Sequence, residues 1–137
     1  MLAKGFPGYL HMIDRGATTL WEQWYYEKAM NSHAHMMFTG PGSTLFTCFA
    51  GIHLLKAGYA ETEIRPVFPR KLDWVDAVRD TPQGRLSVRW RREAGGIAVR
   101  VSVPPTMKSV FVGPTGERRT LESGTENVFR VSEGTVR

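Results

Sequence analysis

The pattern of apolar and polar positions changes character near Gly58. Before that residue, apolar positions are clustered and show no strict alternation, which favours helices and loops. After it, apolar and polar residues alternate over short runs that are separated by glycine- and proline-containing turns, and this is typical of β-strands. We therefore predict two parts: residues 1–59, which are helical and irregular, and residues 60–137, which form β-sheet.

Two helices are expected in the first part. One occupies residues 7–15, because Pro7 suits a first helical position and Gly16 suits the position just past the end. The other covers residues 44–56, with Ser43 as its N-cap. Apolar side chains occupy most of the circumference of this second helix, and such a helix is normally buried in a larger body. The first part is therefore expected to belong to a larger domain.

The second part contains about seven predicted strands. The clearest are residues 86–91 and 97–103, in which alternate apolar side chains face inward and between which a Gly-Gly pair marks a hairpin turn. Turn signals also occur at residues 81–84 and 113–116. Further strands are expected at residues 61–66, 74–79, 109–112, 118–121 and 127–131. Short strands at this spacing predict a small antiparallel β-sandwich.

Composition and charge narrow the function classes. Apolar residues make up 42% of the chain, which is ordinary for a globular protein. The net charge is +5: four basic and three acidic side chains in residues 1–59, then fourteen basic and ten acidic in residues 60–137. Because acids are interspersed with bases, we expect a mixed-charge surface and no nucleic-acid partner. The longest apolar stretch, residues 45–55, is too short to cross a bilayer, and its Cys48 is expected to be a buried thiol.

An aromatic cluster surrounds a single carboxylate in residues 16–26. Glu22 lies between Trp21 and Trp24, and two tyrosines follow. Aromatic rings stack on the apolar faces of sugars, and a hydrophobic surround raises a carboxyl pKa toward the range that suits acid–base chemistry. The same pattern also fits two core tryptophans beside a solvated or capping glutamate.

Two other motifs are weaker candidates for sites. His33 and His35 have the spacing of half a metal site, but the next glutamate is Glu61, at no suitable distance for a cupin-like ligand set. They are interpreted as hydrogen-bonding or structural residues. The glycine-rich run at residues 40–44 lacks the lysine and the spacing of a Walker phosphate loop. No metal and no cofactor are therefore expected.

Three blocks of the chain resemble the bacterial α-L-rhamnosidases, which are six-hairpin glycosidases. The first block, residues 6–24, contains GATTLWEQW and looks like the family signature GATTLWE-x-W. The second, SHAHMMF at residues 32–38 with AGI at residues 50–52, is similar to the family's SHNHxMFG…AGI pattern. The third lies within residues 64–124 and is similar to the family's C-terminal sandwich domain.

The resemblance implies an α+β arrangement, in which the terminal helices of an (α/α)6 barrel precede the β-sandwich. Residues 1–59 would be the C-terminal part of the catalytic domain, and residues 60–137 would be the C-terminal sandwich domain. In this family the anomeric configuration is inverted, and the signature glutamate is the general base that activates water. That role is assigned by resemblance to Glu22.

Resemblance also assigns residues to the sugar pocket. His35 corresponds to the family histidine that contacts the sugar, and Trp21 and Trp24 would help to shape the pocket. The chain departs from the family pattern at Ala34 and Thr39, where the family has Asn and Gly. The loop between the glutamate and the histidine is also shorter than usual, so the sugar specificity is left open.

An inverting glycosidase needs a second carboxylic acid about 6.5–9.5 Å from the first. In the family this general acid lies upstream of the stretch matched here, so the chain by itself is expected to be inactive. The implied partners are a rhamnose-containing carbohydrate and the missing N-terminal part of the same enzyme. No association with a membrane is expected. The alternative function is a non-catalytic carbohydrate-binding or interaction module.

Overall fold

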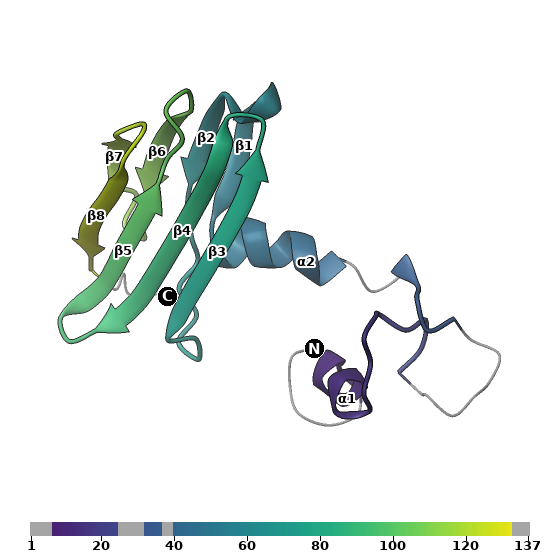
Figure 1. The fold of residues 1–137 in the computed structure, drawn as a ribbon. Helices are drawn as coiled ribbons and strands as arrows, with labels where there is room; N and C mark the ends of the chain where they lie inside the picture. The colour runs from purple at the N-terminus through teal and green to yellow at the C-terminus, as the bar shows by residue number, and fades with distance from the viewer. Residues whose placement is uncertain (1–6, 25–31, 37–39, 133–137) are drawn as a thin grey trace. The chain divides into compact units, whose positions relative to one another are not determined.

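The computed structural model describes residues 7–24, 32–36 and 40–132. The chain forms two compact units, residues 1–43 and residues 44–137. Helix α1 (Tyr9–Asp14) belongs to the first unit, and α2 (Gly40–Thr44) continues directly into a π-helical turn, Leu45–Phe49. Eight strands follow in the described part of the second unit (Figure 1).

Helix α1 confirms the first predicted helix, although it begins at Tyr9 and leaves Pro7 outside. At its C-terminal end, the Gly16 N–H donates a 2.9 Å hydrogen bond to the carbonyl of Ile13. Gly16 has a φ of +81°. Glycine adopts this left-handed conformation at little cost, so Gly16 ends the helix as predicted.

The helix predicted over residues 44–56 is wrong in its C-terminal half. Helical backbone runs from Gly40 to Phe49, and Ile52–Lys56 instead forms strand β1. Ser43 lies inside α2 and is not its N-cap. Between helix and strand, Gly51 has a φ of +70°, and a left-handed glycine at this position stops the helix.

The eight strands form two four-stranded sheets that face each other (Figure 1). The first sheet has the order β1 (Ile52–Lys56), β2 (Glu61–Ile64), β6 (Lys108–Val112) and β7 (Arg118–Leu121). The second has the order β3 (Trp74–Thr81), β4 (Gly84–Glu93), β5 (Gly96–Ser102) and β8 (Glu126–Val131). The predicted sandwich is confirmed, and β1 is an additional strand.

One strand pair departs from the antiparallel arrangement that we predicted. Strands β2 and β6 pair in parallel, so that Thr62 lies opposite Ser109. The chain between them forms β3, β4 and β5 of the other sheet, and a parallel pair requires a long connection of this kind. The buried hydroxyls of Thr62 and Ser109 form a hydrogen bond of 2.7 Å across the pair.

The core of the sandwich lies between the two sheets. Its largest buried apolar side chains are Ile64, Leu86, Val88, Trp90, Ile97, Val99, Val101, Met107 and Phe111. This set confirms the predicted inward faces of β4 and β5. The rings of Phe111 and Phe129 meet edge to face with their centroids 4.8 Å apart. Full burial of one such large side chain contributes about 1.5–3 kcal/mol, so this core is the main source of the sandwich's stability.

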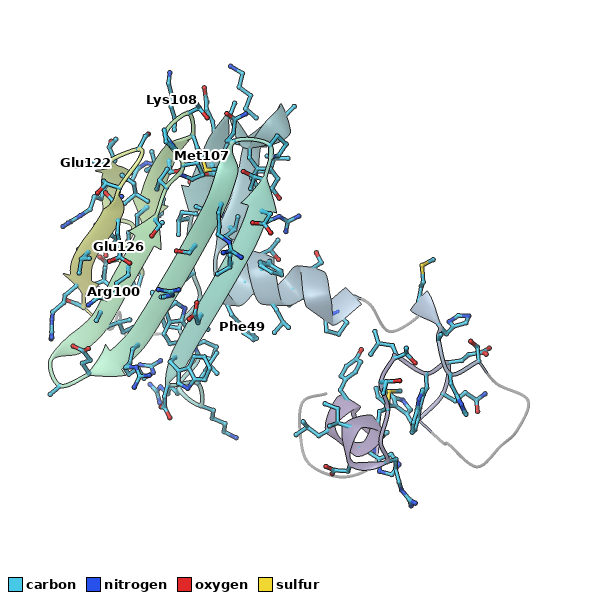
Figure 2. The ribbon with its side chains drawn as sticks, viewed as in Figure 1. Phe49, Arg100, Met107, Lys108, Glu122 and Glu126 are labelled. Carbon is cyan, nitrogen blue, oxygen red and sulfur yellow. The ribbon has the colours of Figure 1, made fainter. Side chains whose placement is uncertain are left out.

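The segment after α2 is bonded to the sandwich. The indole N–H of Trp90 donates a 2.7 Å hydrogen bond to the carbonyl of Phe49, which is labelled in Figure 2. The Arg65 N–H donates to the carbonyl of Gly51 at 2.7 Å. The two backbones pass so closely that a Cβ on Gly51 would lie 2.1 Å from the nitrogen of Pro66. The turn at Gly51 is therefore built into the sandwich.

The apolar side chains of this segment are incompletely covered. Leu45 is 43% exposed, and Leu54 and Leu55 on the edge strand β1 are 52% and 59% exposed. Cys48 is half-buried, so the expectation of a buried thiol is wrong. No helix in the described ranges is long and apolar enough to span a membrane.

Candidate active site

The predicted site residues lie on two segments of the first unit, residues 17–24 and residues 32–36. Backbone hydrogen bonds join these segments at two points. The Glu22 N–H donates to the carbonyl of Ser32 at 2.9 Å, and the His35 N–H donates to the carbonyl of Leu20 at 2.8 Å. The order of these pairs shows that the segments run in opposite directions. Glu22 and His35 therefore lie on adjacent stretches of backbone.

The carboxylate of Glu22 is held by a backbone donor. The N–H of Ser32 donates a 2.9 Å hydrogen bond to Oε2 of Glu22. Together with the bond from the Glu22 N–H, this links the two residues twice. The glutamate is half-buried, and no residue that the structure describes donates to its Oε1. The carboxylate is thus fixed in position and retains lone pairs with which it can accept a proton.

The two tryptophans beside Glu22 are placed differently. Trp21 is 3% exposed, and its ring lies 5.5 Å from the ring of His33 at an interplanar angle of 42°. Trp24 is half-buried and meets Tyr9 edge to face, with ring centroids 5.3 Å apart. Trp21 is therefore a buried residue that packs near the ring of His33, whereas Trp24 is only half-buried.

The two histidines also differ. The carbonyl of His33 accepts a hydrogen bond from the hydroxyl of Thr19, which ties the second segment to the first. His35 is exposed, and its backbone is fixed by the bond to Leu20. Within residues 7–24, 32–36 and 40–132, no group of three or more His, Cys, Asp or Glu side chains is arranged to hold a metal ion.

Sequence reasoning did not single out Ser32 and Thr19, which hold this arrangement together. The Ser32 hydroxyl accepts a 3.1 Å hydrogen bond from the N–H of Ala34, and a serine that bonds the backbone two residues on is a known local turn motif. The turn could have been predicted from the sequence. The pairing of Ser32 with Glu22, ten residues earlier, could not, because it depends on the path of the chain.

Two family profiles match adjacent stretches of the chain. Residues 51–127 match the bacterial alpha-L-rhamnosidase C-terminal domain, and residues 1–49 match the bacterial alpha-L-rhamnosidase 6 hairpin glycosidase domain. The chain belongs to the bacterial α-L-rhamnosidase family. The two matches meet where the helical backbone ends and the left-handed turn at Gly51 begins.

Individual relatives agree with this assignment. An α-L-rhamnosidase of Formosa agariphila is 31% identical over 130 residues, which is 89% of this chain and 14% of that protein. The crystal structure of Streptomyces avermitilis α-L-rhamnosidase complexed with L-rhamnose is 30% identical, with a TM-score of 0.70 over 80% of this chain and 11% of that one. The α-L-rhamnosidase from Dictyoglumus thermophilum is 27% identical, with a TM-score of 0.71 over 96% of this chain and 17% of that one.

Proposed function

We propose that this chain is the C-terminal part of an α-L-rhamnosidase that cleaves terminal α-L-rhamnose from glycosides or polysaccharides with inversion. The chain spans only 14% of the Formosa agariphila relative, which supports a role as one part of a larger enzyme. Residues 1–59 would supply the last helices of an (α/α)6 barrel, and residues 60–137 would supply the sandwich. This division at residue 59 stays a prediction; the upstream part would complete the barrel.

The general base in this proposal is Glu22. Glu22 lies in the string that looks like the family signature, and one contact supports its role most directly. One oxygen of its carboxylate accepts a 2.9 Å hydrogen bond from the Ser32 N–H. In the reaction, the water oxygen bonds to the anomeric carbon while its proton passes to Glu22. The glycosidic C–O bond breaks, and the general acid, supplied by the missing part, protonates the leaving oxygen from the opposite side, at a separation of about 6.5–9.5 Å.

His35 and Trp24 are proposed to contact the sugar, and Trp21 is proposed to help shape the pocket without contacting it. His35 is exposed on the segment that pairs with the Glu22 segment, and in this proposal its imidazole would hydrogen-bond a sugar hydroxyl. Trp24 is half-buried, and in this proposal its ring would pack against the apolar face of a sugar. Trp21 is 3% exposed, so we assign it the indirect role of a buried residue that packs near His33.

A chimera provides the test. This chain would replace the matched C-terminal stretch of the Streptomyces avermitilis α-L-rhamnosidase, whose own upstream part would supply the general acid. We expect the purified 137-residue chain to leave an aryl α-L-rhamnoside intact and the chimera to hydrolyse it. In the chimera, Glu22→Gln preserves an acceptor for the Ser32 N–H but removes the base, so kcat should fall by about 10²–10⁴-fold.

The matched control is Asp14→Asn, which removes an exposed carboxylate of α1 and should leave kcat unchanged. Turnover by the isolated chain would contradict the proposal, as would a Glu22→Gln chimera with undiminished kcat. A folded but inactive chimera, combined with rhamnose binding by the isolated chain, would favour the alternative of a non-catalytic carbohydrate-binding module.

A further inference from the structure

The outer face of the β3-β4-β5-β8 sheet carries a hollow beside an exposed tryptophan. Strand register places Trp74 opposite Arg91, Arg91 opposite Ala98, and Ala98 opposite Arg130. Residues in register across neighbouring strands lie on the same face of a sheet, so these four form one row. Trp74 is 56% exposed. Because the side chain of Ala98 is small, the surface of the sheet is depressed near the middle of this row.

Charged side chains line the adjoining part of the hollow. Arg89 donates from Nε to Oδ1 of Asp76 at 2.9 Å, and Arg100 donates to Oε2 of Glu126 at 3.2 Å. Figure 2 labels Arg100 and Glu126, which lie on the neighbouring strands β5 and β8. The hollow has a volume of about 400 Å³, and Glu93 also contributes to its wall. It therefore offers both hydrogen-bond donors and acceptors around an apolar ring.

Arg91 differs from the other arginines of this face. Arg89, Arg100 and Arg130 are each paired with a carboxylate. Within the part of the chain that the structure describes, Arg91 forms no ion pair, although it lines the same hollow. A guanidinium presents paired N–H donors that match the two oxygens of a carboxylate. The hollow is thus complementary to an acidic group that no described residue supplies to Arg91.

We propose that this face is a binding site for a saccharide that carries a carboxylate, such as a chain containing uronic acid. The sugar ring would lie against the exposed indole of Trp74, and its carboxylate would pair with Arg91. The polar side chains around them, including the Arg89–Asp76 pair, would hydrogen-bond the hydroxyls. None of these residues belongs to the candidate active site, so the proposal does not rest on hydrolysis by this chain.

The test measures the binding of trigalacturonate to the full 137-residue chain by calorimetric titration, with maltotriose as the neutral comparison. We expect trigalacturonate to bind at least tenfold more tightly. Trp74→Ala and Arg91→Ala should each weaken binding by about tenfold, which corresponds to the loss of one good contact. Arg91→Lys keeps the charge but loses the two-pronged geometry, so it should retain only part of the affinity.

The matched control is Arg85→Ala. Arg85 is an exposed arginine of the same strand, β4, and it pairs with Asp80 at 3.3 Å. It lies six positions from Arg91, or about 20 Å along the strand, and also on the outer face, so its removal should leave the affinity unchanged. Circular dichroism would verify that each variant retains the sheet signal.

Several outcomes would overturn this proposal. They are the absence of binding, equal affinity for the neutral and acidic trisaccharides, unchanged affinity in Trp74→Ala and Arg91→Ala, or an equal loss in Arg85→Ala, which would indicate unspecific charge attraction. Binding by the isolated chain that disappears in the folded chimera would also overturn it, because the rest of the enzyme would then cover the face. An inactive chimera would count only against the proposed role of Glu22, because saccharide binding is measured without turnover.

Discussion

In the sandwich, side chains from different strands, such as Leu86 and Val99, are fully buried in one common core. In the described part of residues 7–36, by contrast, the buried apolar side chains are Tyr9, Met12 and Trp21. The sandwich backbone is paired in strand ladders, whereas the segment around Glu22 is held by a few bonds between two short stretches. A small apolar core offsets little of the conformational entropy lost on folding. From the residues that the structure describes, we expect the first unit to depend on surroundings that the sandwich does not need.

The largest expected effect comes from separating the two units. We expect residues 44–137 to fold alone, with dispersed amide NMR signals and cooperative thermal unfolding. We expect residues 1–43 alone to give the narrow signal dispersion of an unfolded chain, because their described core is so small. A folded 1–43 peptide would contradict this difference between the two units, and so would an unfolded 44–137 fragment.

The second prediction concerns Gly51, where the helical segment turns into β1. Gly51→Ala adds a Cβ that would meet the nitrogen of Pro66 at 2.1 Å, at a φ of +70°. We expect the free energy of unfolding to fall by about 3 kcal/mol or more, from overpacking added to left-handed strain. Urea denaturation followed by tryptophan fluorescence would measure it.

Gly58→Ala is the control for Gly51→Ala. Gly58 has a nearly equal φ of +68°, but an added Cβ would meet nothing within 4 Å. This variant should therefore lose only the conformational term, about 1–2 kcal/mol. If the two variants were equally stable, the turn at Gly51 would not be packed into the sandwich as the structure shows.

A smaller effect is expected from the buried hydroxyl pair of the parallel strands β2 and β6. Thr62→Val would leave the hydroxyl of Ser109 without its 2.7 Å partner. The free energy of unfolding should fall by about 1–3 kcal/mol, the cost of a buried unsatisfied group. The double variant Thr62→Val, Ser109→Ala should recover part of that loss, and a double variant less stable than Thr62→Val would contradict the pairing.

The smallest effect is expected at the turn between β6 and β7. Hydrogen bonding to the Thr115 side chain holds the pKa of Glu117 below its ordinary value. A carboxyl with a lowered folded-state pKa adds stability above its unfolded pKa of about 4.3, and this contribution is lost as the pH falls through the folded value. Thr115→Val should therefore raise the pKa of Glu117, which an NMR titration of its carboxyl carbon would measure. An unchanged pKa would show that the hydroxyl bond is not its cause.

Much of the sandwich could be predicted because its strands alternate clearly. Trp90 and Ile97 face inward as the period-2 pattern requires, and the Gly-Gly pair turns the chain between their strands. The outer face of β3 was harder to interpret, since an exposed Trp74 gives the same apolar signal as a buried one. The residues that resemble the family signature identified Glu22, but no local pattern showed that Ser32 would hold its carboxylate.

The sequence by itself determined the alternating strands, their turns and the position of the carboxylate among aromatic residues. Only the tertiary structure decided that residues 52–56 are a strand, that β2 and β6 run parallel, and that Ser32 meets Glu22. In each case the outcome depends on a partner elsewhere in the chain, which the local sequence pattern does not specify. A short apolar run such as residues 52–56 fits either a helix or a strand, and its conformation is chosen by the partner that it bonds, here β2 beside the turn at Gly51.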